Sequence, residues 1–206
     1  MWLNGTQGYA EEADTLVVRY ERAAFSEVHR PILDMIPAAP ARVLDIGSGT
    51  GRDAAALAAM GHRVVAAEPT DAFREAAMAL HPSPSIRWVD DGLPELGAVR
   101  AMDERFDLIM LTAVWMHLEE AERRLAMPQI VALLRDEGIL IMTLRHGVVP
   151  QGRRMFAVTG DETIALAQAQ GLTLKYRELT ESPPNSPNYR AGITWTRLAF
   201  TKPLRG

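Results

Sequence analysis

Residues 43–53 read VLDIGSGTGRD, and this stretch decides the fold of the chain. The mostly apolar run of residues 42–46 predicts a short buried strand. Residues 52–60, RDAAALAAM, predict a helix that Gly61 ends. Three glycines therefore lie between a strand and a helix, where glycine allows a tight turn and a close backbone approach to a ligand. The stretch predicts a ligand-binding loop.

The spacing of Gly47, Gly49 and Gly51 narrows the choice of ligand. A dinucleotide fingerprint reads G-x-G-x-x-G, and its third glycine would fall where this chain has Arg52. A phosphate-binding P-loop would need a Lys-Ser/Thr pair, which the loop lacks. The spacing thus argues against a nicotinamide dinucleotide and against a nucleoside triphosphate.

Strand-like and helix-like stretches alternate on both sides of this loop. Uniformly apolar strands that alternate with helices predict a parallel sheet covered on both faces. Only a loop joins the last two strands, so we expect them to be antiparallel neighbours. The predicted fold is a doubly wound α/β fold with a seven-stranded, mostly parallel sheet and an antiparallel last strand. Its strands are expected at 42–46, 62–67, 86–89, 106–111, 139–144, 172–176 and 194–201, and its helices at 52–60, 71–80, 119–134 and 161–170.

The length of 206 residues suits one α/β domain. We expect residues 38–206 to form a cofactor-binding core and residues 1–37 to form a helical lid that contributes to the substrate site. Residues 9–36 are amphipathic and predict two helices broken near Ser26. The formal net charge of −4 argues against a general basic face for nucleic acid.

The composition excludes several kinds of chemistry. The chain has no Cys, which excludes disulfides, thiolate zinc sites and Cys nucleophiles. Its five His residues lack H-x-x-x-H spacing, so no metal is expected. The N-terminus does not resemble a secretory signal, and no apolar run reaches the roughly 18 residues of a membrane span. We expect a cytoplasmic protein without membrane contact.

Acidic residues follow the second and third predicted strands. Glu68 ends the second strand, about 20 residues after the glycine loop, where a carboxylate can accept both hydroxyls of a ribose. Asp90 and Asp91 follow the third strand, and one of them could accept the amino group of an adenine. These positions predict a site for an adenosine-containing cofactor.

The chain resembles the class I S-adenosylmethionine-dependent methyltransferases over roughly residues 40–145. VLDIGSGTG is similar to the family's first motif, and Glu68 matches its acidic residue after the second strand. Residues 88–91 match its adenine position, and residues 106–118, FDLIMLTAVWMHL, resemble its fourth motif. The segment LRDEGILI departs from the family's L-x-P-G-G-x-L because Asp136 and Glu137 replace Pro-Gly. We expect this change to affect a turn and not the cofactor site.

The resemblance implies S-adenosylmethionine as cofactor, S-adenosylhomocysteine as product and a Rossmann-like methyltransferase fold. It places the methionine moiety at Asp45 and the glycine loop, the ribose at Glu68, the adenine at Asp90 or Asp91, and the sulfonium at the backbone of residues 112–113. The complete set of expected cofactor-binding residues is Asp45, Gly47, Ser48, Gly49, Gly51, Arg52, Glu68, Pro69, Asp90, Asp91, Thr112 and Ala113.

Residues after the fourth and fifth strands are candidates for binding and deprotonating the methyl acceptor. His117 has a suitable pKa for a general base, and His146 is a second candidate. Trp115 would stack on the acceptor or flank the sulfonium. The alternatives are that His117 only shapes the cofactor pocket and that Trp115 belongs to the core.

Arginine and tyrosine side chains complete the expected substrate site. Arg145, Arg153 and Arg154 lie after the fifth strand and could clamp a carboxylate or phosphate. Tyr9 and Tyr20 lie on the predicted lid. The alternatives are a solvated arginine loop and tyrosines that only pack helices together.

The sequence therefore predicts methyl transfer to an O or N atom of a small molecule by a monomer or homodimer. Three alternatives remain at this point. The acceptor could be RNA or protein, the chain could bind the cofactor without transferring a methyl group, or it could be a nicotinamide oxidoreductase, against which Arg52 argues.

Overall fold

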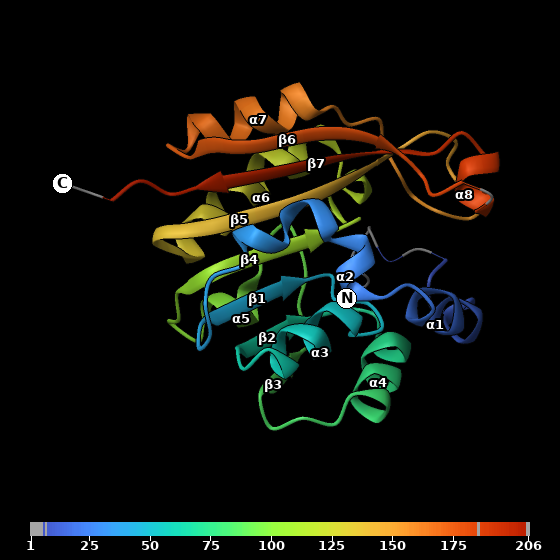
Figure 1. Ribbon diagram of the computed structural model, residues 1–206, viewed down its shortest axis with the longest axis horizontal. Coiled ribbons are helices and arrows are strands. Elements are labelled where there is room, and N and C mark those ends of the chain that lie inside the picture. The colour runs from blue at the N-terminus through green and yellow to red at the C-terminus, as the bar shows by residue number, and fades with distance from the viewer. Residues whose placement is uncertain (1–5, 7, 185, 205–206) are drawn as a thin grey trace.

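A seven-stranded sheet forms the centre of the computed structural model, which describes residues 6, 8–184 and 186–204 (Figure 1). The strand order is β3-β2-β1-β4-β5-β7-β6. β7 lies between β5 and β6 and runs antiparallel to both, whereas the other neighbours are parallel. These findings confirm the predicted fold. The strands are β1 (Arg42–Ile46), β2 (Arg63–Ala67), β3 (Ile86–Val89), β4 (Phe106–Thr112), β5 (Leu134–His146), β6 (Thr173–Glu181) and β7 (Thr194–Thr201).

The glycine loop begins where the direction of the strand order reverses. β1 pairs in parallel with β2 on one side and with β4 on the other. In open α/β sheets, ligands bind beyond the carboxyl ends of the strands at such a switch point. The loop follows Ile46, the last residue of β1, and therefore lies at the edge where a ligand is expected.

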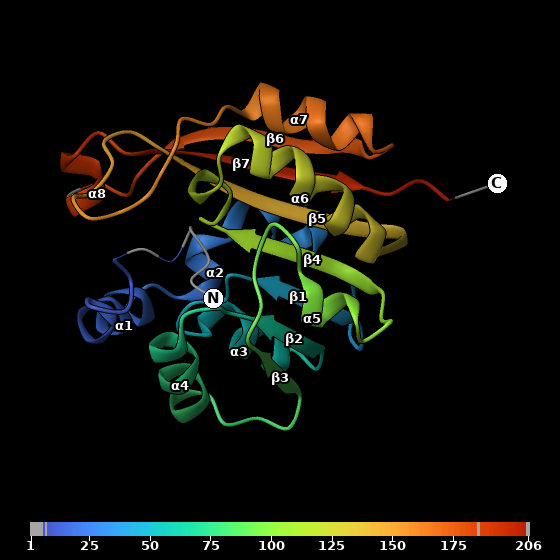
Figure 2. The same cartoon turned by 180° about the vertical axis from the view of Figure 1, so that it is seen from behind.

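Helices cover both faces of the sheet. One face carries α2 (Phe25–Val28), the 3-10 helix η2 (Arg30–Met35) and α3 (Arg52–Ala59) (Figure 1). The other carries α5 (Gly97–Arg100), α6 (Glu120–Leu133) and α7 (Gly160–Ala169) (Figure 2). Successive strand side chains point to opposite faces, so Val43 and Leu44 belong to separate buried clusters. The remaining short elements are the 3-10 helix η3 (Trp115–His117) and α8 (Pro187–Arg190).

The N-terminal helix packs at the carboxyl edge of the sheet. α1 (Ala13–Glu21) contacts α4 (Asp71–Leu80), and Leu16 of α1 forms a buried cluster with Phe73 of α4 (Figure 1). Tyr9 and Tyr20 pack against this cluster. Residues 1–5 and 7 of the expected lid lie outside the described residues.

The predicted break in the N-terminal region is misplaced. Ser26 lies inside α2, and the helical structure is interrupted before it, where Ala24 is extended with φ −65° and ψ 139°. The predicted second helix is instead divided between α2 and η2, and Pro31 lies in the first turn of η2. Proline is tolerated there because the first turn lacks intrahelical N–H partners.

Two strands are longer than the sequence predicts. β5 begins at Leu134, which pairs with Phe106. It therefore includes Asp136 and Glu137, where a turn was expected. The chain near Lys202 holds this segment, since Glu137 N–H donates to the Lys202 carbonyl and Lys202 N–H donates to that of Gly138. β6 continues to Glu181 because residues 178–181 pair with β7, so the expected loop begins later. The four-residue helices α5 and α8 escaped prediction because they are too short to show a period.

Candidate functional site

The glycine loop has a backbone that only glycine fits at two positions. Gly47 has φ +67°, and a Cβ there would lie 2.6 Å from the side chain of Val114. Gly51 has φ +83°, and its Cβ would lie 2.4 Å from the ring of Trp88. A Cβ at Gly49 would instead meet no atom within 4 Å. The loop is therefore packed at both ends and open at its middle.

Two buried polar groups at this loop have no partner among the described residues. Oδ2 of Asp45 and Oγ of Ser48 are buried without a hydrogen bond. Burial, followed by the charge of nearby Asp53, raises the pKa of Asp45 well above its ordinary value. A buried carboxylate oxygen without a partner is unfavourable unless a cation or donor reaches it, and the backbone hydrogen bond from Ala54 leaves this Asp45 oxygen unsatisfied. The ammonium of a methionine moiety is a cation and also a hydrogen-bond donor, so these residues fit the implied cofactor.

Glu68 holds the loop in place from the end of β2. Its Oε2 accepts the Gly49 N–H at 2.8 Å, and its Oε1 accepts the Thr70 N–H at 2.8 Å. Burial raises the pKa of Glu68, and these two backbone bonds oppose the rise. Each carboxylate oxygen has a second lone-pair direction, so a ribose hydroxyl can still be accepted. Pro69 lies between Glu68 and the N-cap residue Thr70.

The two acidic residues after β3 have different surroundings. Asp91 caps the following segment, accepting the N–H groups of Gly92 and Val99 at 2.8 Å each. Asp90 is exposed and forms an ion pair with Arg74 at 3.4 Å. Arg74 also donates to the carbonyl of Glu68, which links the ribose and adenine positions. Both oxygens of Asp91 accept backbone N–H groups, whereas Asp90 pairs with Arg74 through only one oxygen. Asp90 is therefore the better candidate for the adenine.

A buried network beneath the loop was missed by the sequence analysis. Oδ2 of Asp53 lies 2.8 Å from Nε2 of His29 and accepts the Thr112 hydroxyl at 2.8 Å, while Arg52 Nε donates to Oδ1 at 2.8 Å. Burial disfavours the ionised Asp53, but the hydrogen bond and charge of His29, with Arg52, hold its pKa below the usual range. Asp53 follows Gly51 by two residues, so its closeness to the glycine loop could have marked it as a site residue. Nothing in the sequence connects His29 with it.

The end of β4 carries a strained backbone. Ala113 has φ +59°, a left-handed conformation that costs a non-glycine residue free energy. Its N–H donates to the Thr143 carbonyl at 3.1 Å, which holds it in place. Such strain clusters at functional sites. Ala113 is where the family resemblance places the sulfonium.

Tyr9 and His117 contact each other just after the end of β4, where the methyl acceptor is expected. The Tyr9 hydroxyl oxygen lies 3.0 Å from His117 Nε2, and His117 Nδ1 lies 2.8 Å from the Arg154 carbonyl oxygen. A carbonyl only accepts, so Nδ1 carries the proton and Nε2 accepts from Tyr9. Burial raises the pKa of Tyr9 and lowers that of His117. Both side chains are thus neutral near pH 7.

Arg145, which lies inside β5 near its end, and Arg153 and Arg154 of the following loop do not form one clamp, contrary to expectation. Arg153 lies over the Tyr9 ring, 3.9 Å from its centroid, and pairs with Glu12 at 2.6 Å. Arg154 pairs with two carboxylates of the α6 N-terminus, those of Glu119 and Glu122. Arg154 therefore anchors the segment whose carbonyl orients His117. Only Arg145 has no carboxylate partner among the described residues.

Three other candidates, two for the acceptor and one for the base, make packing or hydrogen-bond contacts. Trp115 is fully buried in the larger core cluster and presents no surface to an acceptor, so the alternative that it belongs to the core is the one the structure supports. His146 Nε2 lies 2.8 Å from the Thr196 hydroxyl, and its ring also bonds to the backbone of Val158. These contacts hold the ring against β7 and the segment before α7. Tyr20 packs against Phe73 at 6.3 Å between ring centroids.

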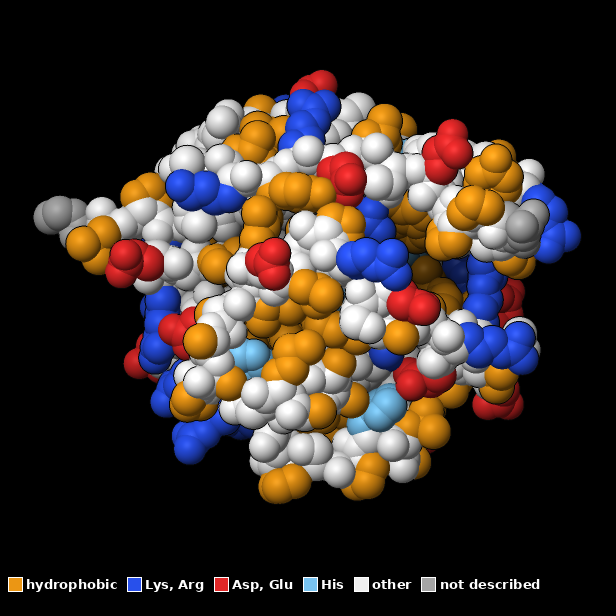
Figure 3. All heavy atoms as spheres, in the orientation of Figure 1, with side chains coloured by type: hydrophobic (Ala, Val, Ile, Leu, Met, Phe, Trp, Pro, Cys, Tyr) orange, Lys and Arg blue, Asp and Glu red, His pale blue; other side chains and the backbone are white. Residues whose placement is uncertain are grey.

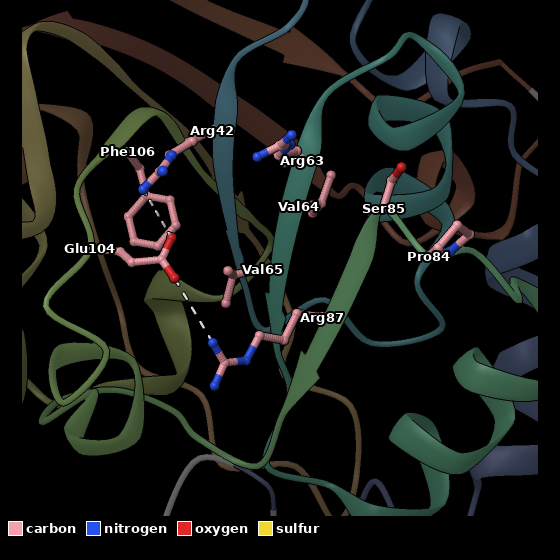
Figure 4. A pocket seen from close by; sticks show the side chains of 9 residues that line it. All are labelled: Arg42, Arg63, Val64, Val65, Pro84, Ser85, Arg87, Glu104 and Phe106. Carbon is pink, nitrogen blue, oxygen red and sulfur yellow. Dashed lines mark hydrogen bonds and ion pairs between the residues drawn. The ribbon is translucent and has the colours of Figure 1, made fainter.

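Two cavities lie at opposite edges of the sheet. One of about 320 Å³ borders the candidate site; it is lined by Met116, Arg145, His146, Gly147, Val149, Met155, Phe156, Ala157 and Val158. Figure 3 shows a hollow with hydrophobic and Lys or Arg side chains on the side where α1 and α8 lie. The other cavity, of about 550 Å³, lies at the amino ends of β1 to β4, where Arg42 and Arg87 both pair with Glu104 (Figure 4). It contains none of the predicted site residues.

The described part of the chain has neither a membrane-spanning helix nor a cluster of metal ligands. Within residues 6, 8–184 and 186–204, no helix is long and apolar enough to cross a bilayer. Among the same residues, no group of three or more His, Cys, Asp or Glu could hold a metal ion.

Comparisons with known proteins agree with the geometry. A family model described as a methyltransferase domain matches residues 43–138. No curated protein matches the sequence significantly.

Three solved structures resemble the chain along most of its length. The 1,6-didemethyltoxoflavin-N1-methyltransferase of Burkholderia thailandensis, with bound 1,6-didemethyltoxoflavin and S-adenosylhomocysteine, is 21% identical with TM-score 0.67, covering 99% of each chain. A TehB-like methyltransferase of Corynebacterium glutamicum is 24% identical with TM-score 0.64, covering 93% of this chain and 98% of that one. The N-methyltransferase NodS of Bradyrhizobium japonicum is 18% identical with TM-score 0.66, covering 93% and 99%. At these identities the likeness establishes the fold.

Proposed function

Because this chain belongs to the class I S-adenosylmethionine-dependent methyltransferases, we propose that it transfers a methyl group to an O or N atom of a small-molecule acceptor. One observation carries the choice of acceptor atom. The Tyr9 hydroxyl donates to a neutral His117 beside the expected methyl position. An O–H or N–H acceptor must lose a proton, and this pair is arranged to take it.

The proposed cofactor site uses residues from three strand ends. Asp45 and Ser48 would bind the methionine moiety, because each has a buried oxygen without another partner in the described residues. Glu68 would bind the ribose and Asp90 the adenine. When bound, S-adenosylmethionine supplies a methyl group on a positively charged sulfur, open to in-line displacement by an acceptor lone pair. The buried network of Asp53, Thr112 and His29 supports the loop from below.

The proton leaves through Tyr9 and His117. The acceptor proton passes to the Tyr9 oxygen as the Tyr9 hydroxyl proton passes to His117 Nε2. The imidazolium that forms keeps its Nδ1–H on the Arg154 carbonyl, 2.8 Å away. Neutral Tyr9 and neutral His117 are the protonation states that this relay requires, and the directions of their pKa shifts favour both.

We also propose that residues 1–37 act as a lid on a core formed by residues 38–206. Supporting this, α1 packs on α4 and Tyr9 reaches the segment after β4. The lid supplies half of the proton relay, so relay assembly would be coupled to lid closure. The cytoplasmic location, the independence from metal and the monomeric or homodimeric state stay predictions from the sequence.

The direct test follows the cofactor product. The purified chain is incubated with S-adenosylmethionine and panels of phenols, amines and hydroxy acids, and S-adenosylhomocysteine formation is measured. Total RNA and unfolded protein serve as parallel acceptors. We expect turnover with small molecules that is unaffected by ribonuclease. Turnover only with RNA or with protein would overturn the proposed acceptor class.

A further inference from the structure

Arg145 is the one arginine of the β5–α7 connection region without a carboxylate partner in the described part of the chain. Arg153 pairs with Glu12, and Arg154 pairs with Glu119 and Glu122. The residues outside the described ranges include neither Asp nor Glu. Within the described residues, no Asp or Glu therefore forms an ion pair with Arg145.

The contacts of the Arg145 guanidinium leave donors available. Its Nη2 donates to the Val148 carbonyl at 2.9 Å, and its Nη1 lies 3.9 Å from the sulfur of Met155. A thioether sulfur is a weak acceptor, and a guanidinium has five N–H donors. Arg145 is partly buried, and burial lowers its pKa. A partly desolvated cation without an anion is unfavourable, so a bound anion would stabilise this arrangement.

Arg145 faces both a cavity and the proton relay. It lines the 320 Å³ cavity, whose other walls are mostly apolar and include Val149 and Phe156. This volume suits a small organic molecule. Burial raises the pKa of Tyr9 and lowers that of His117, and the positive charge of Arg145 weakly opposes the first shift and adds to the second, so Arg145 lies within electrostatic reach of the pair. Met116, also in the cavity wall, directly precedes His117.

We propose that Arg145 binds a carboxylate of the methyl acceptor while the apolar body of the acceptor occupies this cavity. The acceptor is then a small, largely apolar organic acid that also carries an O–H or N–H group. A single-charged carboxylate fits better than a phosphate, because Glu12 already neutralises Arg153 and leaves one unpaired guanidinium. Arginine binds a carboxylate in a planar, two-bonded geometry. The inference rests on the proposed function, since it assigns the substrate of the same site.

Benzoate and its neutral isostere benzamide are the probes for this site. Their binding is measured by calorimetry in the presence of saturating S-adenosylhomocysteine. We expect the wild-type protein to bind benzoate at least about tenfold more tightly than benzamide, as charge-assisted bonds allow. Arg145→Gln should abolish the preference, and Arg145→Lys should keep part of it because the charge remains. Arg124→Gln is the matched control, since Arg124 is exposed on α6 and pairs only locally with Glu120.

Three outcomes would overturn the inference: no benzoate binding, equal binding of both probes, or an undiminished preference in Arg145→Gln. S-adenosylhomocysteine binding by each variant shows that it has folded. Methyl transfer by the wild-type protein is measured in the same preparation, using the acceptor panel. If transfer is found but benzoate is not preferred, only this inference fails. If no transfer to any small molecule occurs, the proposed function fails.

Discussion

The Tyr9 hydroxyl lies 3.0 Å from Nε2 of His117, across 108 positions of sequence. The contact joins the N-terminal region to the segment after β4. The Arg154 carbonyl fixes the histidine tautomer, because it can only accept the Nδ1 proton, and this leaves Nε2 to accept from Tyr9. Arg153, over the Tyr9 ring, adds a positive charge that opposes protonation of His117. The proposed proton relay therefore needs both the N-terminal region and the segment after β4.

Removing the proposed base should slow methyl transfer without weakening cofactor binding. We expect His117→Gln to lower kcat by about 10²- to 10⁴-fold, the usual contribution of general base catalysis. Tyr9→Phe keeps the ring against Phe73 and Arg153 but removes the hydroxyl. We expect it to lower kcat as well, by a smaller factor than His117→Gln. Steady-state kinetics and S-adenosylhomocysteine calorimetry check both. Unchanged kcat in His117→Gln would refute the relay.

Asp45→Asn should weaken cofactor binding and stabilise the cofactor-free protein. The loss of a charge-assisted contact of about 1.5–3 kcal/mol corresponds to roughly tenfold to a hundredfold in affinity. The pKa of Asp45 is raised by burial, so its contribution to folding is present at low pH and lost as pH rises from about 4 towards the folded pKa. The Asn side chain of Asp45→Asn stays neutral, so this variant does not lose folding stability in that way at pH 7.

Calorimetry and urea unfolding at pH 7 test the Asp45 prediction together. Asp103→Asn is the matched control, because the Asp103 side chain is 98% exposed. Tighter cofactor binding by Asp45→Asn would contradict the assignment of this carboxylate. Equal stability of the wild-type protein and Asp45→Asn at pH 7 would contradict the burial argument.

Gly51→Ala should destabilise the protein more than Gly171→Ala. Both glycines have φ +83°, so the conformational cost of a Cβ, roughly 1–2 kcal/mol, is shared. Only at Gly51 would the Cβ meet Trp88, at 2.4 Å, whereas Gly171 faces open space. Overpacking adds about 1–3 kcal/mol. Urea denaturation measures the difference, and equal losses in the two variants would show that the loop relaxes around the methyl group.

Asp53→Asn should destabilise the protein in a pH-dependent way. The pKa of Asp53 is lowered in the folded state, so its stabilising contribution is present above the unfolded pKa of about 4 and is lost as pH falls below it. The difference in unfolding free energy between wild type and Asp53→Asn should therefore shrink from pH 6 to pH 3. A difference that is constant over this range would show that ionisation of Asp53 contributes nothing to stability.

The sequence predicted the sheet well because the information is local. Each buried strand is a short apolar run, and the positive φ angles of Gly47 and Gly51 leave glycine as the residue that fits. Boundaries failed where pairing partners decide them. β5 and β6 are extended by hydrogen bonds to the C-terminal segment and to β7, which no periodicity of their own residues encodes.

By itself, the sequence determined the doubly wound sheet, the glycine loop and the acidic residues after β2 and β3, since each follows from residue type and spacing along one strand or turn. Only the tertiary structure decided which side chains act together. It buried Trp115, paired Arg153 and Arg154 with different carboxylates, left Arg145 facing a cavity and joined Tyr9 to His117. These outcomes depend on which distant segments pack together, and on how burial and neighbouring charge then change each group.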